Sequence, residues 1–250
     1  MNMAALSLTA SDLTRYKRQI VFPGFGEEGQ KRLKESHVLV AGLGGIGCPA
    51  SIYLACAGVG HITIVDSDFI EPSNLNRQIL HWDSDVGKKK VLSAARKLRK
   101  LNSSIEVTPV FERITERNAG YIIAGCQAVI DATDNFETRL VLNAACVKER
   151  IPLIHGGVRG FLGEVTTVIP GKTPCLACIF PRAPNRRGFP VFGVSPGLVA
   201  MLQVTEAIKL LSQFGELLLG KMLYFNGETM GFYMRELTRR PECEVCREVG

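Results

Sequence analysis

The chain has 250 residues, a net charge of +6, 46% hydrophobic and 22% charged residues, which suit one large α/β domain, with or without a small appendage. No apolar run approaches the roughly 18 residues of a membrane span, and the N-terminus lacks the basic start and long apolar segment of a secretory signal. The basic residues form no stripe interleaved with aromatic side chains, which argues against a nucleic-acid partner. We therefore expect a cytoplasmic protein with no membrane or nucleic-acid partner.

Short apolar runs alternate with helical patterns along the first two thirds of the chain. Residues 11–35 predict two helices separated by a turn at Pro23-Gly24. Strands and helices then alternate, with strands expected at 38–41, 61–68, 104–111, 126–135 and 151–157 and helices at 48–60, 86–102, 115–124 and 135–150. This alternation predicts a doubly wound, Rossmann-like, mostly parallel sheet.

The last third of the chain changes character. Residues 195–215 predict a helix, and 221–240 predict two strands of an antiparallel hairpin across Asn226-Gly227. No internal repeat or independent second domain is visible. The predicted parts of the single domain 1–250 are an N-terminal helical arm (1–35), a nucleotide-binding core (36–170), a cysteine knuckle with a crossover loop (171–195) and a C-terminal helix, hairpin and second knuckle (196–250).

A glycine motif lies between the first strand and the next helix. Its glycines are Gly42, Gly44 and Gly47, and they allow the backbone to approach a phosphate at a helix N-terminus. Asp66 follows Gly47 by 19 residues, at the end of the second strand, where a carboxylate can bind ribose hydroxyls. The motif predicts a nucleotide site without separating NAD or FAD from ATP, and a tight turn without a ligand is the alternative.

Polar side chains in the loops after the strands favour a triphosphate. These loops gather at the carboxyl ends of the strands in an open parallel sheet. Arg77, Lys90 and the carboxylate of Asp134 suit ATP with Mg²⁺, and a nicotinamide would not need them. Taken alone, the lysine run at 88–90 is more typical of a solvated helix face. The other candidates for the nucleotide site are Asp68, Ser73, Asn74, Asn76, Gln78 and Asn135.

Two C-x-x-C pairs, Cys175/Cys178 and Cys243/Cys246, are separated by 64 residues. Four thiolates suit a tetrahedral Zn²⁺ site, which is normally structural because it leaves no open position. Redox-active cysteines are the alternative interpretation. The expected zinc would clamp the C-terminal tail to the crossover segment.

Together these residues resemble the MoeB/ThiF/HesA family, bacterial and archaeal relatives of ubiquitin-activating enzymes. The resemblance covers nearly the whole chain, and the matching segments, in the family's order, are RYKRQIVFPGFGEEGQ, GLGGIGCPASIYLACAGVG, VDSD, SNLNRQIL, DVGKKK, DATDN, the cysteine pairs and SPGLVAMLQVTEAIKLL. It implies a homodimeric, ATP-dependent adenylyltransferase. Its substrate would be the C-terminal carboxylate of a ubiquitin-like sulfur-carrier protein ending in Gly-Gly, and pyrophosphate would be released.

The resemblance also implies roles for individual residues. Those that would bind the nucleotide, its ribose and its phosphates are Gly45, Asp66, Asn74, Arg77 and Lys90. Asp134 would hold Mg²⁺, and Arg18 would reach the partner protomer's site as an arginine finger. The alternative for Arg18 is a surface charge on an N-terminal helix.

The expected chemistry needs no general base, because a carboxylate nucleophile with a pKa of roughly 3.5 is already ionised at neutral pH. The histidines can therefore be structural; they are His37, His61, His81 and His155.

The crossover segment departs from the family pattern. Many members carry a cysteine after the first knuckle that can form a thioester or persulfide, whereas this chain has Arg186 and Arg187 there and no cysteine between Cys178 and Cys243. We therefore expect adenylation without an enzyme thioester, with an external sulfur donor.

Three alternatives remain open at the level of sequence. The enzyme could adenylate a small-molecule carboxylate in a cofactor or natural-product pathway. It could be an NAD(P)-dependent oxidoreductase, in which Lys90 and Asp134 would be dispensable, or a scaffold that binds a ubiquitin-like protein without turnover.

Overall fold

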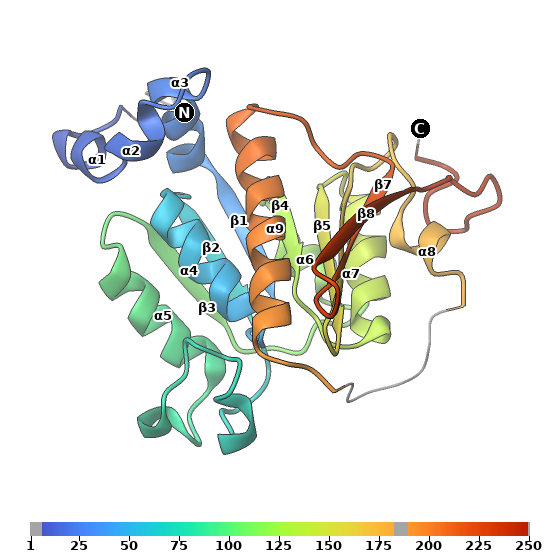
Figure 1. Cartoon of the computed structure of the whole chain (residues 1–250), viewed down its shortest axis with the longest axis horizontal. Coiled ribbons are helices and arrows are strands. Elements are labelled where there is room, and N and C mark those ends of the chain that lie inside the picture. Colours follow the sequence, from blue (N-terminus) through green and yellow to red (C-terminus); the bar gives the residue numbers. More distant parts are fainter. Residues whose placement is uncertain (1–6, 183–189, 250) are drawn as a thin grey trace.

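The computed structural model describes residues 7–182 and 190–249, and its centre is an eight-stranded sheet of order β3-β2-β1-β4-β5-β6-β7-β8 (Figure 1). The first five strands are parallel and the last three pair antiparallel, which confirms the doubly wound, mostly parallel sheet expected from the sequence. The strands are β1 (His37–Ala41), β2 (His61–Val65), β3 (Glu106–Val110), β4 (Ala128–Asp131), β5 (Leu153–Arg159), β6 (Leu162–Val168), β7 (Lys221–Asn226) and β8 (Gly231–Glu236).

Helices cover both faces of the parallel strands (Figure 1). One face carries α4 (Gly47–Ala57), α5 (Lys90–Leu101) and α9 (Val194–Ser212), and the other carries α6 (Ala119–Ile123) and α7 (Phe136–Lys148). Successive side chains of a strand point to opposite faces of the sheet. In β1, Val38 and Val40 therefore pack in the hydrophobic core beneath α4, α5 and α9, while Leu39 and Ala41 pack in the core beneath α6 and α7. The central strands are therefore apolar throughout, as parallel strands buried on both faces require.

The register of the central strands brings three loops together. Ala41 of β1 lies opposite Val65 of β2 and Asp131 of β4. Because these strands run in the same direction, the segments that follow them leave the sheet at the same edge. The glycine motif, the loop after β2 with its 3-10 turns η1 (Pro72–Asn74) and η2 (Asp83–Asp85), and the start of α7 all begin there.

The N-terminal arm packs at the other end of the parallel strands, away from the glycine motif. Its helices are α1 (Ala10–Arg15), α2 (Lys17–Ile20) and α3 (Gly26–Glu35), one more than predicted because the first helical segment divides at Tyr16. The side-chain amides of Gln19 and Gln30 donate to the carbonyl oxygen of Ala57, at 2.8 and 3.0 Å. These bonds cap the C-terminal end of α4, so the arm lies at the amino ends of the strands.

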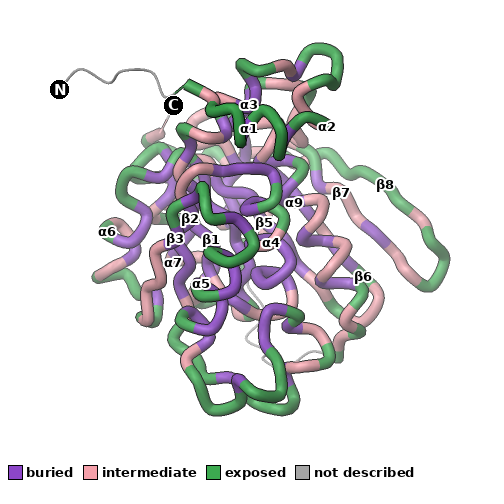
Figure 2. Tube along the Cα trace, turned by 90° about the vertical axis from the view of Figure 1, so that its left-hand side faces the viewer, coloured by how far each residue is buried: buried purple, intermediate pink, exposed green. Residues whose placement is uncertain are grey.

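The C-terminal hairpin has a longer turn than the sequence suggested. Asn226 pairs with Gly231, so four residues connect β7 to β8, and the expected two-residue turn at Asn226-Gly227 is wrong. The Asn226 side-chain oxygen accepts a hydrogen bond from the backbone of Glu228 at 2.9 Å, and Met230 takes the left-handed conformation (φ 54°) that a glycine turn would have supplied. Figure 2 shows this hairpin extending from the buried body with β8 largely exposed.

By length and composition alone, helix α9 is long and apolar enough to cross a membrane. Polar residues are scattered along it, so it does not form an uninterrupted apolar run in the sequence. Half of the apolar stretch is buried within the protein, where α9 packs against α4, β5 and β6. Core helices pass the same test, and Val199 and Ala200 are fully buried here.

Gly58 ends α4 with φ 85°, and a Cβ atom there would lie 2.5 Å from Cζ of Tyr16. Gly58→Ala should therefore cost both left-handed backbone strain and overpacking, about 2–4 kcal/mol in the free energy of unfolding measured by urea denaturation. Gly125→Ala is the matched control, because Gly125 has φ 77° with nothing within 4 Å, and it should lose only about 1 kcal/mol. Equal losses in the two variants would show that the arm does not crowd this position.

Candidate functional site

The glycine loop is held in shape by close backbone contacts. A Cβ atom on Gly47 would lie 1.8 Å from the carbonyl oxygen of Gly42, and one on Gly42 (φ 94°) would lie 2.7 Å from the carbonyl oxygen of Ala132. Gly44, by contrast, faces open space, with its nearest neighbour beyond the loop, Gln78 Nε2, 3.9 Å from a Cβ position. Within the described chain, the amides of Gly44 and Gly45 donate to no other residue. Free amides before a helix N-terminus suit a phosphate.

Gly45 is enclosed by two other segments. A Cβ atom there would lie 3.0 Å from Cγ of Pro196 and 3.3 Å from Cγ of Arg77. A Cβ atom on Gly193 would lie 2.5 Å from the carbonyl oxygen of Asn76, so the start of α9 rests on the loop after β2. The start of α9 is not among the predicted site residues, and its signal in the sequence is the SPG run at residues 195–197.

Asp66 links the glycine loop to the loop after β2. Its two carboxylate oxygens accept hydrogen bonds from the backbone of Leu43 and of Asp68, both at 2.7 Å. Burial raises the pKa of Asp66, and the charge of Lys90 and the two amide donors offset only part of this effect. Lys90 begins α5 with its side chain 7% exposed and its ammonium 2.8 Å from the more exposed carboxylate of Asp68.

The turn η1 positions the remaining candidates of this loop. The Asn74 side-chain oxygen accepts a bond from the backbone of Glu71 at 3.1 Å, so it is occupied by local structure. The Arg77 guanidinium donates to the carbonyl oxygen of Ser73 and to Asn76 Oδ1, both at 2.9 Å. Gln78 is buried, and its side-chain oxygen has no hydrogen-bond partner in the described chain, so it can accept a bond from a ligand or a water molecule.

Asp134 lies next to the glycine loop because β4 neighbours β1. Its carboxylate is exposed and accepts a bond from Asn135 Nδ2 at 3.2 Å. The other side-chain atom of Asn135, Oδ1, caps α7 by accepting from the backbone of Thr138 at 2.9 Å. Asn135 thus has a structural role, while Asp134 presents an exposed carboxylate, the kind of ligand that Mg²⁺ prefers.

A buried charge network supports the Asp134 loop from below. Asp131, fully buried, lies 2.8 Å from Nε of Arg139 and 2.8 Å from Nδ1 of His155, and it accepts two bonds from Thr133. Burial alone would raise the pKa of Asp131, but the Arg139 guanidinium and the bonds from His155 and Thr133 hold it well below its usual range. This network was not predicted from the sequence, because Arg139 and His155 are 8 and 24 residues from Asp131 along the chain.

Arg18 is exposed on α2, in the arm at the opposite edge of the sheet from the glycine loop. The length of α4, 11 residues or about 16 Å, separates the two ends. Within one chain the structure therefore does not bring Arg18 to the site, and its action on a partner protomer stays a prediction. Arg186 and Arg187, the other predicted cations, lie outside the described residues.

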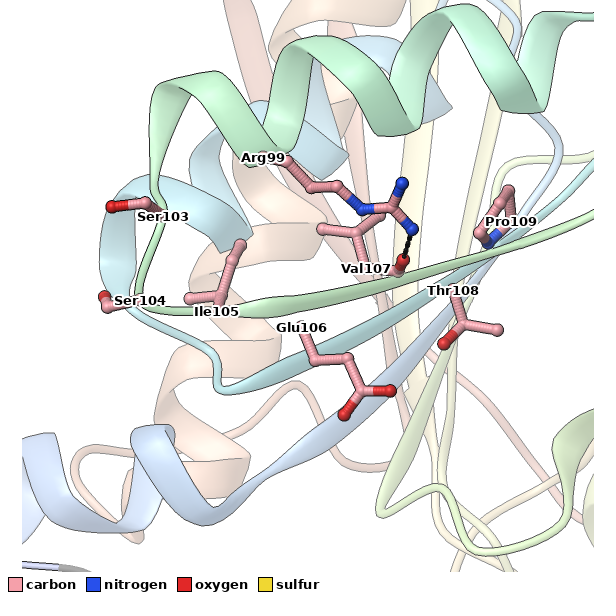
Figure 3. Close-up of a pocket in the computed structure, with 8 residues that line it drawn as sticks. All are labelled: Arg99, Ser103, Ser104, Ile105, Glu106, Val107, Thr108 and Pro109. Atoms are coloured by element: carbon pink, nitrogen blue, oxygen red, sulfur yellow. Dashed lines mark hydrogen bonds between the residues drawn. The ribbon is translucent and has the colours of Figure 1, made fainter.

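A hollow of about 760 Å³ runs along the edge strand β3 (Figure 3). It includes Ser103, Ser104 and Arg99, whose guanidinium donates to the carbonyl oxygen of Val107. None of the predicted site residues lines it, and it follows the outer side of β3 from Ser103 to Pro109, away from the glycine loop between β1 and α4. It is therefore not the nucleotide site.

The four knuckle cysteines form one buried cluster, with all sulfur atoms within 4.8 Å of one another. The sulfurs of Cys175 and Cys243 are 3.7 Å apart and those of Cys178 and Cys246 are 3.5 Å apart. A tetrahedral Zn²⁺ with Zn–S bonds of about 2.3 Å needs S–S separations of about 3.8 Å, so the cluster fits the ion. Short helix α8 (Leu176–Ile179) begins after Cys175, and Asn143 of α7 accepts from its first amide at 2.9 Å.

Backbone amides favour a thiolate in the second knuckle. Burial alone would raise the pKa of Cys243, but bonds from the amides of Cys246 and Val245 lower it to about 7. Burial dominates at Cys175 and raises its pKa. A divalent cation would favour the thiolate at all four positions.

The sequence matches the ThiF family over residues 16–245. The chain belongs to the ThiF family. It is 45% identical to the SAMP-activating enzyme E1 of Haloferax volcanii, over 98% of this chain and 93% of that protein. It is 42% identical to the vegetative HesA protein of Trichormus variabilis, over 96% and 92% of the two chains. It is 41% identical to MOCS3 of Drosophila sechellia, an adenylyltransferase and sulfurtransferase, over 96% of this chain but 54% of that protein.

Among solved structures, the chain is similar to E. coli MccB with ATP, with a TM-score of 0.83, 28% identity, and coverage of 95% of this chain and 75% of that one. The family resemblance inferred from the motifs is thereby confirmed. So is the enzyme class: the chain is an ATP-dependent adenylyltransferase.

The cysteine cluster predicts a metal-dependent fold. Cys175→Ser should lose bound zinc and lower the thermal unfolding midpoint by several degrees, because metal binding to such sites is coupled to folding. Elemental analysis and thermal unfolding check this. Cys56→Ser is the control, since Cys56 is exposed and outside the cluster, and it should change neither quantity. Zinc content that is unchanged in Cys175→Ser would contradict the assignment.

His81 is buried beside the glycine loop, with Nε2 3.7 Å from the sulfur of Cys48, and burial lowers its pKa to about 4. In the unfolded chain His81 has an ordinary pKa of about 6.5. Between pH of about 4 and 6.5 it is therefore protonated in the unfolded chain and neutral in the folded one. This group's stabilisation is thus complete above pH of about 6.5 and lost toward about 4, by up to about 1.4 kcal/mol per pH unit. When the free energy of unfolding is measured by urea denaturation at several pH values, it should fall less steeply between pH of about 6.5 and 4 for His81→Asn than for the wild type. Parallel pH dependences in the two proteins would refute the role of His81.

Proposed function

We propose that this enzyme uses ATP and Mg²⁺ to adenylate the C-terminal carboxylate of a ubiquitin-like sulfur-carrier protein. The observation that carries the proposal is the convergence, in a ThiF-family chain, of a glycine loop with free amides, the buried ammonium of Lys90 and the exposed carboxylate of Asp134. These groups match a triphosphate and its cation.

The reaction is a displacement at the α-phosphorus of ATP. A carboxylate oxygen forms a bond to the α-phosphorus, the bond from that phosphorus to the α–β bridging oxygen breaks, and pyrophosphate leaves with the electron pair. Arg77 and Lys90 stabilise the charge that spreads over the phosphates, and Asp66 binds the ribose. Asp134 would hold Mg²⁺, which supplies further positive charge. The ionised carboxylate needs no general base.

A carrier protein as substrate is supported by the relatives. One is named as a SAMP-activating enzyme and another as an adenylyltransferase and sulfurtransferase. The chain spans about half of the latter, and we propose that an external donor supplies the sulfur.

The cysteines support activation without an enzyme thioester. Burial raises the pKa of Cys48 and of Cys126 to about 12 and also raises those of Cys56 and Cys146, so none is a ready nucleophile. Cys56 is exposed, but it lies near the C-terminal end of α4, away from the glycine loop. We further propose a cytoplasmic homodimer, in which Arg18 of one protomer serves the site of the other.

A second candidate substrate is the carboxylate of a peptide or small molecule. It is favoured by the similarity to MccB, whose structures include a complex with AMPCPP and MccA. The chemistry at the phosphorus would be the same, and only the group that presents the carboxylate would differ.

Lys90→Met should reduce ATP–pyrophosphate exchange about 100-fold, because the buried ammonium beside the phosphates is lost. Exchange is measured with the purified protein and, in separate reactions, ubiquitin-fold carriers ending in Gly-Gly, peptides and small acids. Lys100→Met on the exposed face of α5 is the control and should retain activity. Exchange with small acids but no carrier would favour the second candidate, and no exchange with any substrate would exclude adenylation.

A further inference from the structure

A network of buried charged and polar groups lies behind Asp134. It places an ion pair, a histidine and a glutamate beneath a single surface carboxylate. Buried charged groups are costly unless they are fully paired, so their arrangement around one loop calls for an explanation.

Arg139 ties the strand end to the residue before Asp134. Its Nε donates to the carboxylate of Asp131 at 2.8 Å, and its Nη2 donates to the carbonyl oxygen of Thr133 at 2.8 Å. Asp131 in turn accepts from the amide and the hydroxyl of Thr133, at 3.1 and 2.6 Å. Thr133 is therefore fixed through its amide, carbonyl and hydroxyl groups. Asn135, on the other side of Asp134, is fixed as the N-cap of α7.

The strand end is also held from the opposite face of the sheet. The Gln203 side-chain amide on α9 donates to the carbonyl oxygens of Asp131 and Ile154, at 2.8 and 2.9 Å. It fits there because Gly156 has no side chain: a Cβ atom would lie 2.6 Å from Cδ of Gln203. Neither the side chain nor the backbone of Asp131 can shift without breaking a buried bond.

His155 joins this network to the antiparallel half of the sheet. Its Nδ1 lies 2.8 Å from Asp131 and its Nε2 lies 3.6 Å from the carboxylate of Glu164 on β6. A Cβ atom on Gly157 would lie 2.9 Å from that carboxylate, so glycine again makes the space. His155 is fully buried, and it bonds Oδ2 of Asp131 while Thr133 bonds Oδ1.

We propose that Arg139, with Asp131 and His155, is a positioning unit that fixes the direction of the Asp134 carboxylate for the cation of ATP. The inference rests on the proposed function, which takes Asp134 as the ligand of that cation. Mg²⁺ demands near-ideal octahedral geometry, so a ligand held in place before binding gains affinity that a mobile one does not. None of the three residues touches the nucleotide in this proposal; they act through the backbone on both sides of Asp134.

Arg139→Lys separates charge from geometry, because lysine keeps the positive charge but cannot bridge Asp131 and Thr133 with a planar fork. We expect Mn²⁺·ATP, a paramagnetic stand-in for Mg²⁺·ATP, to bind about tenfold more weakly, as measured by electron paramagnetic resonance. Binding of ATP in the presence of a chelator should be unchanged. Arg96→Lys is the control, since Arg96 also pairs with a fully buried carboxylate, Asp85, in an ion pair that includes none of the proposed site residues.

A double-mutant cycle distinguishes positioning from general stability. In an Asp134→Asn background, Arg139→Lys should cause no further loss of Mn²⁺·ATP affinity, because its effect runs through the missing carboxylate. His155→Gln keeps a donor toward Asp131 and should weaken binding less than Arg139→Lys. Thermal unfolding of each variant shows whether it is folded at the assay temperature. If Arg139→Lys is not folded there, the Mn²⁺·ATP affinity of His155→Gln tests the proposal in its place.

The outcomes are distinct. If the wild type binds Mn²⁺·ATP and Asp134→Asn weakens it while Arg139→Lys does not, the positioning role is overturned and the proposed function stands. Equal losses with and without metal, or additive losses in the cycle, overturn it as well. If the wild type itself does not bind Mn²⁺·ATP, both proposals fall.

Discussion

The site depends on the close backbone contact between the ends of β1 and β4. The chain can turn from β1 into α4 only because Gly42 and Gly47 leave no side chain between the loop and Ala132. This contact determines how far the free amides of the loop stand from the Asp134 turn. A side chain at Gly42 would push the two strand ends apart, and with them the groups that face the phosphates and those that face the cation. A side chain at Gly47 would meet the carbonyl oxygen of Gly42 and distort the loop itself.

The elements with strong local signals were predicted well from the sequence. The parallel order followed from alternating apolar strands and helices, and the spacing of the cysteine pairs predicted the four-cysteine cluster. The glycine motif lies between β1 and α4 as expected, and the roles of its residues at a nucleotide stay a prediction. The hairpin was found, but its turn was wrong, because Asn226-Gly227 satisfies a local preference while the pairing of Asn226 with Gly231 decides the loop length.

What the sequence did not reveal depends on contacts between distant segments. Pro196 against Gly45 joins residues some 150 positions apart, and no periodicity predicts it. The partners of Asp131 come from α7 and β5, and Gln203 reaches its backbone from α9. Single histidines and arginines in apolar strands and helices read as isolated side chains until the fold assembles them.

The cysteine cluster has a consequence for the entropy of the chain. A metal bound by both knuckles would close a loop in which 64 residues separate Cys178 from Cys243, and this loop contains α9, β7 and β8. Chain-entropy relations for cross-links of this length give about 4 kcal/mol, gained by restricting the unfolded state rather than by any contact in the folded one. Since the first turn of α9 encloses Gly45, the same cross-link would limit how often this wall of the nucleotide loop opens by local unfolding.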